Sequence, residues 1–190
     1  MDGIQGLENL DLRCSGCGEC CKRLRVTLTH RDLARLRSFT SEPASRWVDW
    51  LAPDLVDMQG EPESFVELRE GRRLMVLAHA QGACWFLSAD QRCSVYAARP
   101  RDCRVFPYDW QREREGRVVR LALLPEPNCV LQTGPRSSLP LELAEDDERW
   151  AELRQYQDLV ARWNRLASRR RRFGHRLGSA QEFIEYLEVK

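Results

Sequence analysis

The sequence predicts an α+β fold, in which a small, loop-rich antiparallel sheet is surrounded by helices and followed by a long C-terminal helix. Three observations predict this fold class. Two short apolar runs flank a turn-forming segment in the first half of the chain, apolar residues recur every three or four positions from residue 144 on, and four of the eight cysteines fall within eight consecutive residues. With 190 residues and 43% hydrophobic content, the chain is long enough to form a packed core without disulfides.

Helices are expected early in the chain. Thr29 is placed to cap a helix that ends near Ser41, with Leu33 and Leu36 on its apolar face. Pro43 can occupy the first turn of a second helix that Pro53 ends. This second helix would carry Trp47, Val48, Trp50 and Leu51. Residues 54–63 are expected to form a loop.

The sheet is predicted from the apolar runs at 65–68 and 74–78. Between them lies Arg-Glu-Gly-Arg, where Gly71 can adopt a positive φ, and this pattern is typical of a hairpin. Residues 83–87, 93–96 and 118–124 are expected to extend the sheet, interrupted by cysteines and prolines.

A long helix is predicted from about Ala144. Its apolar stripe comprises Trp150, Leu153, Tyr156 or Gln157, Val160, Trp163, and Leu166 or Ala167. The basic run 169–172 and Gly174 end it, and Ser179-Ala-Gln-Glu182 is a capping-box pattern for a last short helix. We expect a cysteine-cluster metal-binding domain over residues 1–135 and a helical extension over 136–190 that packs on it.

Composition limits the classes of partner. Thirty basic and 29 acidic residues leave a formal charge of +1, so no overall attraction to nucleic acid or anionic membranes is expected. The run Arg169–Arg172 is interpreted as a solvated helix end, and no specific nucleic-acid binding is predicted. The N-terminus lacks a signal-like apolar run, so a cytoplasmic protein without membrane contact is expected. A protein partner or protein substrate remains open.

The strongest functional signal is the run Cys14-Ser-Gly-Cys17-Gly-Glu-Cys20-Cys21. In a reducing cytosol, clustered cysteines bind metals more often than they form disulfides. Three cysteines at successive spacings of two match the run that places thiolates on a [4Fe–4S] cluster, whereas zinc sites more often use two separated pairs. Cys20 and Cys21 are adjacent, so they either face two centres or include one non-ligand.

A second cysteine-rich stretch contains Cys84, Cys93 and Cys103, and a late cysteine, Cys129, follows. Arg99 and Arg104 flank Cys103, where their guanidinium groups can neutralise the negative charge of a thiolate-bound centre. Pro100 can start a helical turn that presents Cys103, and Tyr96 and Phe106 are expected to form a dry wall around the site.

These motifs resemble the CxxCxxCC cysteine-cluster family, also called the YkgJ family, a zinc- or iron-chelating domain. The resemblance runs from the first cluster through Cys-x8-Cys-x2-Tyr-x2-Arg-Pro-x2-Cys-Arg-x-Phe-Pro to the last cysteine. It implies metal ligation by Cys14, Cys17, Cys20, Cys21, Cys84, Cys93, Cys103 and Cys129.

The sequence therefore predicts a metal-binding protein and assigns it no reaction. The favoured cofactor is an iron–sulfur cluster of the [4Fe–4S] type, and zinc is the alternative. One other hypothesis is a structural zinc-binding interaction module. Another is a component related to protein lysine N-methylases, since flagellin lysine N-methylases contain a similar module. None of His30, His79 and His175 is assigned as a ligand, and Asp146-Asp147-Glu148 is interpreted as the acidic first turn of the long helix.

Overall fold

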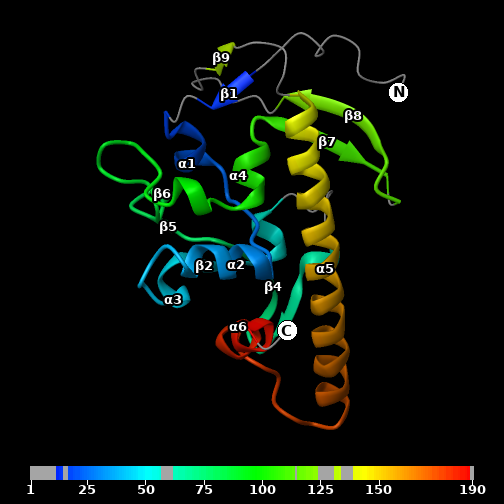
Figure 1. The fold of residues 1–190 in the computed structure, drawn as a ribbon. Helices are drawn as coiled ribbons and strands as arrows, with labels where there is room; N and C mark the ends of the chain where they lie inside the picture. Colours follow the sequence, from blue (N-terminus) through cyan, green and yellow to red (C-terminus); the bar gives the residue numbers. More distant parts are fainter. Residues whose placement is uncertain are drawn as a thin grey trace.

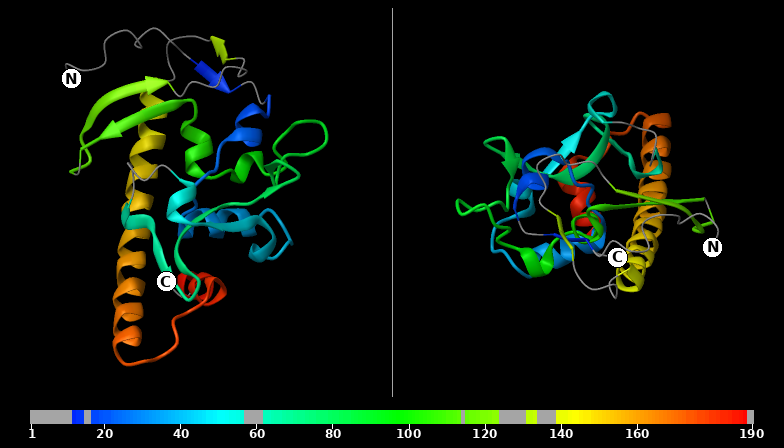
Figure 2. Two further views of the ribbon diagram at one scale, coloured as in Figure 1. Left: turned by 180° about the vertical axis from the view of Figure 1, so that it is seen from behind. Right: turned by 90° about the horizontal axis from the view of Figure 1, so that it is seen from above.

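The structure is a computed structural model that describes residues 12–14, 17–56, 62–113, 115–123, 131–133 and 139–188. Side chains are described within 17–56, 62–113, 115–122 and 143–188. Helix α5 (Leu139–Arg172) runs along one side of the molecule, and α1, α3, β5 and β6 lie on the side away from it (Figures 1 and 2). None of the helices in these ranges is long and apolar enough to cross a membrane.

The central sheet has three antiparallel strands in the order β2-β4-β3. Strands β3 (Val66–Leu68) and β4 (Gly71–Leu77) form the predicted hairpin, in which Leu68 pairs with Gly71 and Gly71 has a φ of +99°. Strand β2 (Val48–Leu51) pairs along the other edge of β4. The predicted helix over residues 43–53 is therefore wrong in its second half, because only α3 (Ala44–Trp47) is helical. The β-branched Val48 and the aromatic Trp50 suit a strand, and pairing with β4 satisfies the backbone.

Helix α2 (His30–Arg37) packs beside this sheet and begins at the predicted capping box. The Asp32 N–H donates to Thr29 Oγ1 at 3.2 Å, and the Thr29 N–H donates to the Asp32 carboxylate at 3.0 Å. The helix ends at Arg37, four residues before the expected end. Short 3₁₀ turns, η1 (Pro53–Leu55) and η2 (Pro62–Ser64), occupy part of the predicted loop.

The remaining strands form separate two-stranded sheets, so the predicted extension of the central sheet is wrong. They are β1 (Leu12–Cys14) with β9 (Leu131–Thr133), β5 (His79–Ala80) with β6 (Ala83–Cys84), and β7 (Tyr108–Arg112) with β8 (Val118–Leu123). Between β6 and β7 the chain forms only a Leu87–Cys93 bridge, the 3₁₀ turn η3 (Tyr96–Ala98) and helix α4 (Arg101–Val105). Pro100 and Pro107 have no N–H to donate to a sheet, which limits strand formation here.

Helices α5 and α6 (Ala180–Glu188) contribute to the same core as α2 and the central sheet. Leu153, Tyr156, Val160, Trp163 and Ala167 of the predicted stripe are buried, whereas Leu166 is 46% exposed. Phe183 of α6 is fully buried and lies edge-on to Trp163. Gly174 follows α5 with a φ of +70°, and the Ser179–Glu182 capping box is present at α6. The long C-terminal helix is thus confirmed, and it forms one wall of the core.

Candidate metal centre

The cysteines of the first cluster lie in and before a short helix, α1 (Glu19–Arg23). Gly18 precedes it with a φ of +76°, a conformation that lets the chain turn between Cys17 and the helix. Cys20 and Cys21 lie in the first turn of α1. Their thiols are within hydrogen-bonding reach of each other, so the adjacent cysteines are not directed to opposite sides.

Two other segments bring further thiols to this helix. Cys84 ends strand β6, which contacts α1, and its thiol is within hydrogen-bonding reach of Cys21. Cys103 lies in the middle of α4, whose preceding residue is Pro100, as expected from the sequence. Cys93 is held by the bridge to Leu87.

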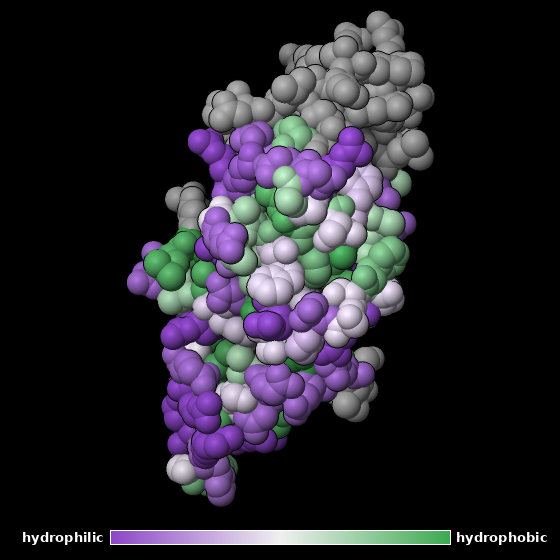
Figure 3. Space-filling view, turned by 90° about the vertical axis from the view of Figure 1, so that its left-hand side faces the viewer, coloured by the Kyte–Doolittle hydropathy of each residue, from purple (hydrophilic) through white to green (hydrophobic). Residues whose placement is uncertain are grey.

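All six cysteines whose side chains are described line one cavity of about 620 Å³. They come from three stretches of the chain, residues 17–21, 84–93 and 103. No disulfide joins any of these six cysteines. Within the described side chains, no three His, Cys, Asp or Glu residues form a ready shell around a single ion. Figure 3 shows hydrophobic residues gathered in the upper half of one face, at the height of α1 and α4 in Figure 1.

A second cavity of about 270 Å³ shares four of these cysteines, namely Cys20, Cys21, Cys84 and Cys103. Its other walls are mostly apolar and include Val105, Phe106, Tyr108 and Trp110. The four shared thiols therefore separate two cavities, and a metal centre held by them would be adjacent to both.

The predicted ligands Cys14 and Cys129 can be placed only in part. Cys14 ends strand β1, and its register partner is Leu131 of β9. Cys129 precedes Leu131 by two positions in the sequence and lies outside the described residues. The side chain of Cys14 is likewise outside the described set.

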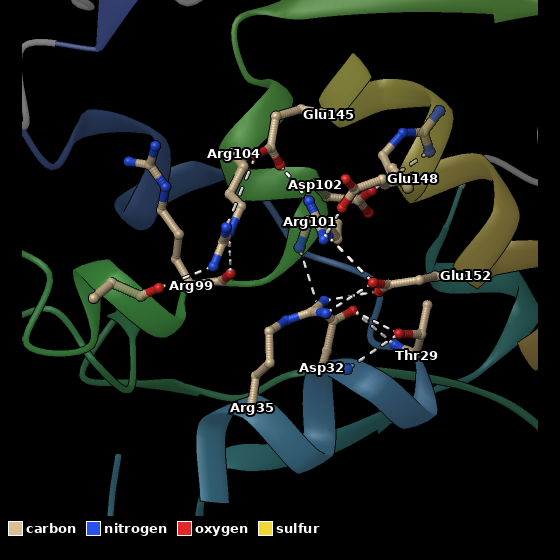
Figure 4. A network of polar contacts seen from close by, with 12 residues as sticks. Thr29, Asp32, Arg35, Arg99, Arg101, Asp102, Arg104, Glu145, Glu148 and Glu152 are labelled. Carbon is tan, nitrogen blue, oxygen red and sulfur yellow. Dashed lines mark hydrogen bonds and ion pairs between the residues drawn. The ribbon is translucent and has the colours of Figure 1, made fainter. Parts of the chain in front are cut away.

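The two arginines predicted to neutralise the site have different surroundings. Arg99 lines the larger cavity, and its guanidinium stacks on the Tyr96 ring at 4.0 Å. Figure 4 shows the Arg99 side chain directed away from the carboxylates of α5. Arg104 instead donates to the backbone oxygens of Ala97 and Arg99. These hydrogen bonds hold the end of the 3₁₀ turn η3 against α4.

The aromatic residues of the motif differ in the same way. Phe106 is buried and lines the smaller cavity, as expected. Tyr96 is 51% exposed, so it does not form part of a dry wall. Its stacking on Arg99 places it at the surface, since the guanidinium stays hydrated while its face contacts the ring.

Three of these partly buried thiols have raised pKa values in the metal-free protein. The hydrogen bond with Cys21, together with burial, raises the pKa of Cys20. The hydrogen bond from Cys20 favours the Cys21 thiolate, but the contact with Cys84 and burial outweigh it and raise the pKa of Cys21 to about 12. Burial likewise raises the pKa of Cys103. A cation would supply the missing positive charge, so its binding would release protons.

Two residues without a role in the sequence analysis border the same thiols. His79 lines the smaller cavity, pairs with Cys84 across the β5–β6 hairpin, and its Nε2 lies 3.1 Å from the Leu24 carbonyl oxygen. The spacing His79-Ala-Gln-Gly-Ala-Cys84 is itself a hairpin signal that predicts this pairing. Asp102 also lines the smaller cavity, and 38% of its side chain is accessible. Burial of the carboxyl group raises the pKa of Asp102, and the positive charge of Arg149 opposes this effect.

Comparison with known proteins gives one match. Residues 13–120 match the model of the CxxCxxCC family, described as "Putative zinc- or iron-chelating domain". No curated protein and no solved structure was found to match the chain. The matched range includes seven of the eight cysteines and ends before Cys129. It also ends before α5 and α6. Because the match covers more than half of the chain and its cysteines line one cavity, the chain belongs to the CxxCxxCC family of zinc- or iron-chelating domains.

Proposed function

We propose that the protein binds a metal centre through its cysteine thiolates and that the centre is an iron–sulfur cluster of the [4Fe–4S] type. The observation that carries this proposal is the convergence of six thiols from three stretches of the chain on one cavity. Thiolates are the ligands that iron–sulfur clusters and zinc prefer, so the donor set fits either group.

Two features favour a cluster over a single zinc ion. A structural zinc ion takes about four ligands, whereas six described thiols line this cavity of about 620 Å³. The spacing of Cys14, Cys17 and Cys20 is that of a cluster-binding run. The proposed ligands therefore come from the six described cysteines together with Cys14 and Cys129, and zinc is the alternative occupant.

The residues around the thiols would set the properties of the centre. Arg99 lines the larger cavity and would offset the negative charge of the thiolates from there. Val105 and Phe106 would give the opposite side, in the smaller cavity, an apolar wall. When bound, a [4Fe–4S] cluster supplies one-electron transfer or a Lewis-acidic iron.

The smaller cavity favours a metal centre that can bind a small molecule, rather than a metal centre with a purely structural role. Structural metal sites are closed, whereas reactive sites keep one side open to a ligand. Imidazole, added to the metal-loaded protein, is expected to change the visible or EPR spectrum of the metal. An unchanged spectrum at saturating imidazole would favour a closed, structural centre.

The decisive experiment is elemental analysis of protein purified without oxygen, with acid-labile sulfide and the visible spectrum measured on the same sample. About four iron and four sulfide per chain would support the cubane cluster. Zinc without sulfide would support the zinc alternative. The variant Cys20→Ser, analysed in parallel, is expected to lose metal, and an unchanged metal content would remove Cys20 from the ligand set.

A further inference from the structure

Cys103 lies on α4, a helix of only five residues. Isolated helices of this length are not stable in water, so tertiary contacts must fix the position and direction of α4. Cys103 lines both cavities, which makes its placement critical for any centre formed there.

The start of α4 is fixed by α2. The Arg101 N–H, the first of the helix, donates to Asp32 Oδ1 at 3.1 Å. The other carboxylate oxygen of Asp32 accepts from the N–H and the hydroxyl of Thr29. Only 2% of the Asp32 side chain is exposed, so one buried carboxylate joins the N-termini of the two helices.

The Arg101 side chain then ties α4 to α5. Its guanidinium bonds to three carboxylates on successive turns of α5, those of Glu145, Glu148 and Glu152 (Figure 4). Glu152 also receives both terminal nitrogens of Arg35, at 2.8 Å each, which closes a network across α2, α4 and α5. The side chain of Arg101 is 13% exposed and that of Glu152 is 8% exposed.

The next residue makes a second connection to the same helix. Asp102 pairs with Arg149 of α5 at 3.5 Å, and Arg149 pairs in turn with the fully buried Asp146 at 2.7 Å. Both residues that immediately precede Cys103 are therefore anchored to α5. Desolvating the buried carboxylates of Asp146 and Glu152 is costly, so these ion pairs add little net stability, and the role left for them here is to fix the position of α4.

We propose that α5, which lies outside the family match, positions the Cys103 thiol through Arg101 and Asp102, so that a metal centre in this chain depends on its C-terminal helix. This inference rests on the proposed metal binding. Arg101 and Glu152 are positioning residues, since Glu152 bonds to the Arg101 side chain two positions before Cys103 and neither residue lines either cavity.

The test follows the protection of each cysteine by the metal. The metal-loaded full chain is treated with N-ethylmaleimide, digested with chymotrypsin and analysed by mass spectrometry for alkylation at each cysteine. In Arg101→Ala, Cys103 is expected to react about 10- to 100-fold faster than in the unsubstituted protein, while Cys17 and Cys20 stay protected. Arg101→Lys keeps the positive charge but loses the planar set of guanidinium donors. Its rate of Cys103 alkylation is expected to lie between those of Arg101→Ala and the unsubstituted protein.

Asn164→Ala is the matched control. Asn164 joins α5 to the segment of β3 by accepting from the Glu67 N–H at 2.7 Å and donating to the Phe65 carbonyl at 2.8 Å, and neither hydrogen bond involves α4. Its loss is expected to lower stability without exposing Cys103 selectively. If Arg101→Ala does not fold, Glu148→Gln, which removes one Arg101 partner at an exposed position, replaces it.

Two results would overturn the inference in distinguishable ways. If the metal protects Cys103 from alkylation equally well in Arg101→Ala and Asn164→Ala, positioning by α5 is refuted and metal binding is left intact. No metal-dependent protection of any cysteine in the unsubstituted protein would instead refute the proposed metal site, and the inference with it.

Discussion

At the scale of single residues, Gly18 is the tightest point of the cysteine cluster. Its φ is +76°, and a Cβ there would lie 2.8 Å from the Gln91 carbonyl oxygen and 3.0 Å from Leu87 Cδ1. Gly18→Ala is therefore expected to incur both a backbone cost of about 1–2 kcal/mol and a packing cost of about 1–3 kcal/mol in the free energy of unfolding. Urea denaturation monitored by tryptophan fluorescence measures the sum.

Gly82→Ala separates the two contributions. Gly82 has a similar φ of +84°, but a Cβ there would meet nothing within 4 Å. Only the backbone cost should appear, about 1–2 kcal/mol. Equal losses in the two variants would mean that the segment around Gln91 moves aside freely and does not constrain the turn at Cys17.

Glu152 gives the ion-pair network a predictable dependence on pH. Burial alone would raise the pKa of Glu152, but its hydrogen bonds with Arg35 and the charges of Arg35 and Arg101 outweigh burial and hold the pKa below its usual value. A lowered folded-state pKa contributes stability above the unfolded value of about 4.3, and this contribution is lost as the pH falls through the folded value.

Glu152→Gln is therefore expected to lower the free energy of unfolding by about 2 kcal/mol at pH 7. The difference from the unsubstituted protein should shrink as the pH falls below about 4.3, where the unfolded carboxylate gains a proton, and should be lost once the pH is below the lowered native pKa. Glu63→Gln, at an exposed position, is the control for the change in net charge. A difference between Glu152→Gln and the unsubstituted protein that stays constant from pH 7 to pH 3 would contradict the ionised pairing.

The residue scale also shows what the sequence could and could not predict about the site. The cysteines and the helical turn after Pro100 were predictable because short spacings carry the signal. The partners of Arg101 were not, since Asp32 and Glu152 lie 69 and 51 positions away from it. Asp146 was interpreted as part of an acidic first helical turn, but the helix begins at Leu139 and Asp146 is buried against Arg112 and Arg149.

At the scale of elements, the chain offers two capping boxes with different neighbours. The box of α2 includes Asp32, which also holds the start of α4. In the box of α6, Glu182 bonds to Ser179 and pairs with Arg176, and neither partner belongs to α4. Thr29→Ala and Ser179→Ala should each cost about 1 kcal/mol in unfolding free energy. Only Thr29→Ala is expected to increase the alkylation of Cys103 in the metal-loaded protein, because it frees Asp32 from one of its contacts. If Cys103 reacts at the same rate in both variants, α2 does not contribute to the placement of α4.

Elements with local signals were the predictable ones. The hairpin at Gly71, the cap at Thr29 and the long apolar stripe of α5 are all encoded within a few residues. Strand β2 was mistaken for helix because Trp47, Val48, Trp50 and Leu51 suit either period, and pairing with β4 decides between them. Strand β7 was not predicted, although Tyr108 and Trp110 alternate with polar residues at the period of a strand.

At the scale of the whole molecule, the proposed division into residues 1–135 and 136–190 crosses a shared core. Leu28, Trp47 and Met75 from the first part and Tyr156, Val160 and Phe183 from the second are all nearly inaccessible to solvent and belong to one cluster. Two further contacts fix β3 to α5, where the Trp163 indole N–H and the Asn164 amide donate to backbone carbonyls at 2.9 and 2.8 Å. The first part therefore lacks one wall of its core when it is alone.

The fragment 1–135 is accordingly expected not to fold cooperatively and not to retain metal. Removing α5 and α6 would expose the buried faces of α2 and the central sheet and leave Arg35 and Arg101 without Glu152, a loss that exceeds the roughly 5–15 kcal/mol by which domains of this size are stable. Thermal unfolding followed by circular dichroism, with metal analysis of the same sample, tests this. Co-expression of 136–190 should restore both properties if packing alone is needed. A sharp melting transition and full metal content in 1–135 alone would show instead that the family-matched part forms the centre without the C-terminal helices.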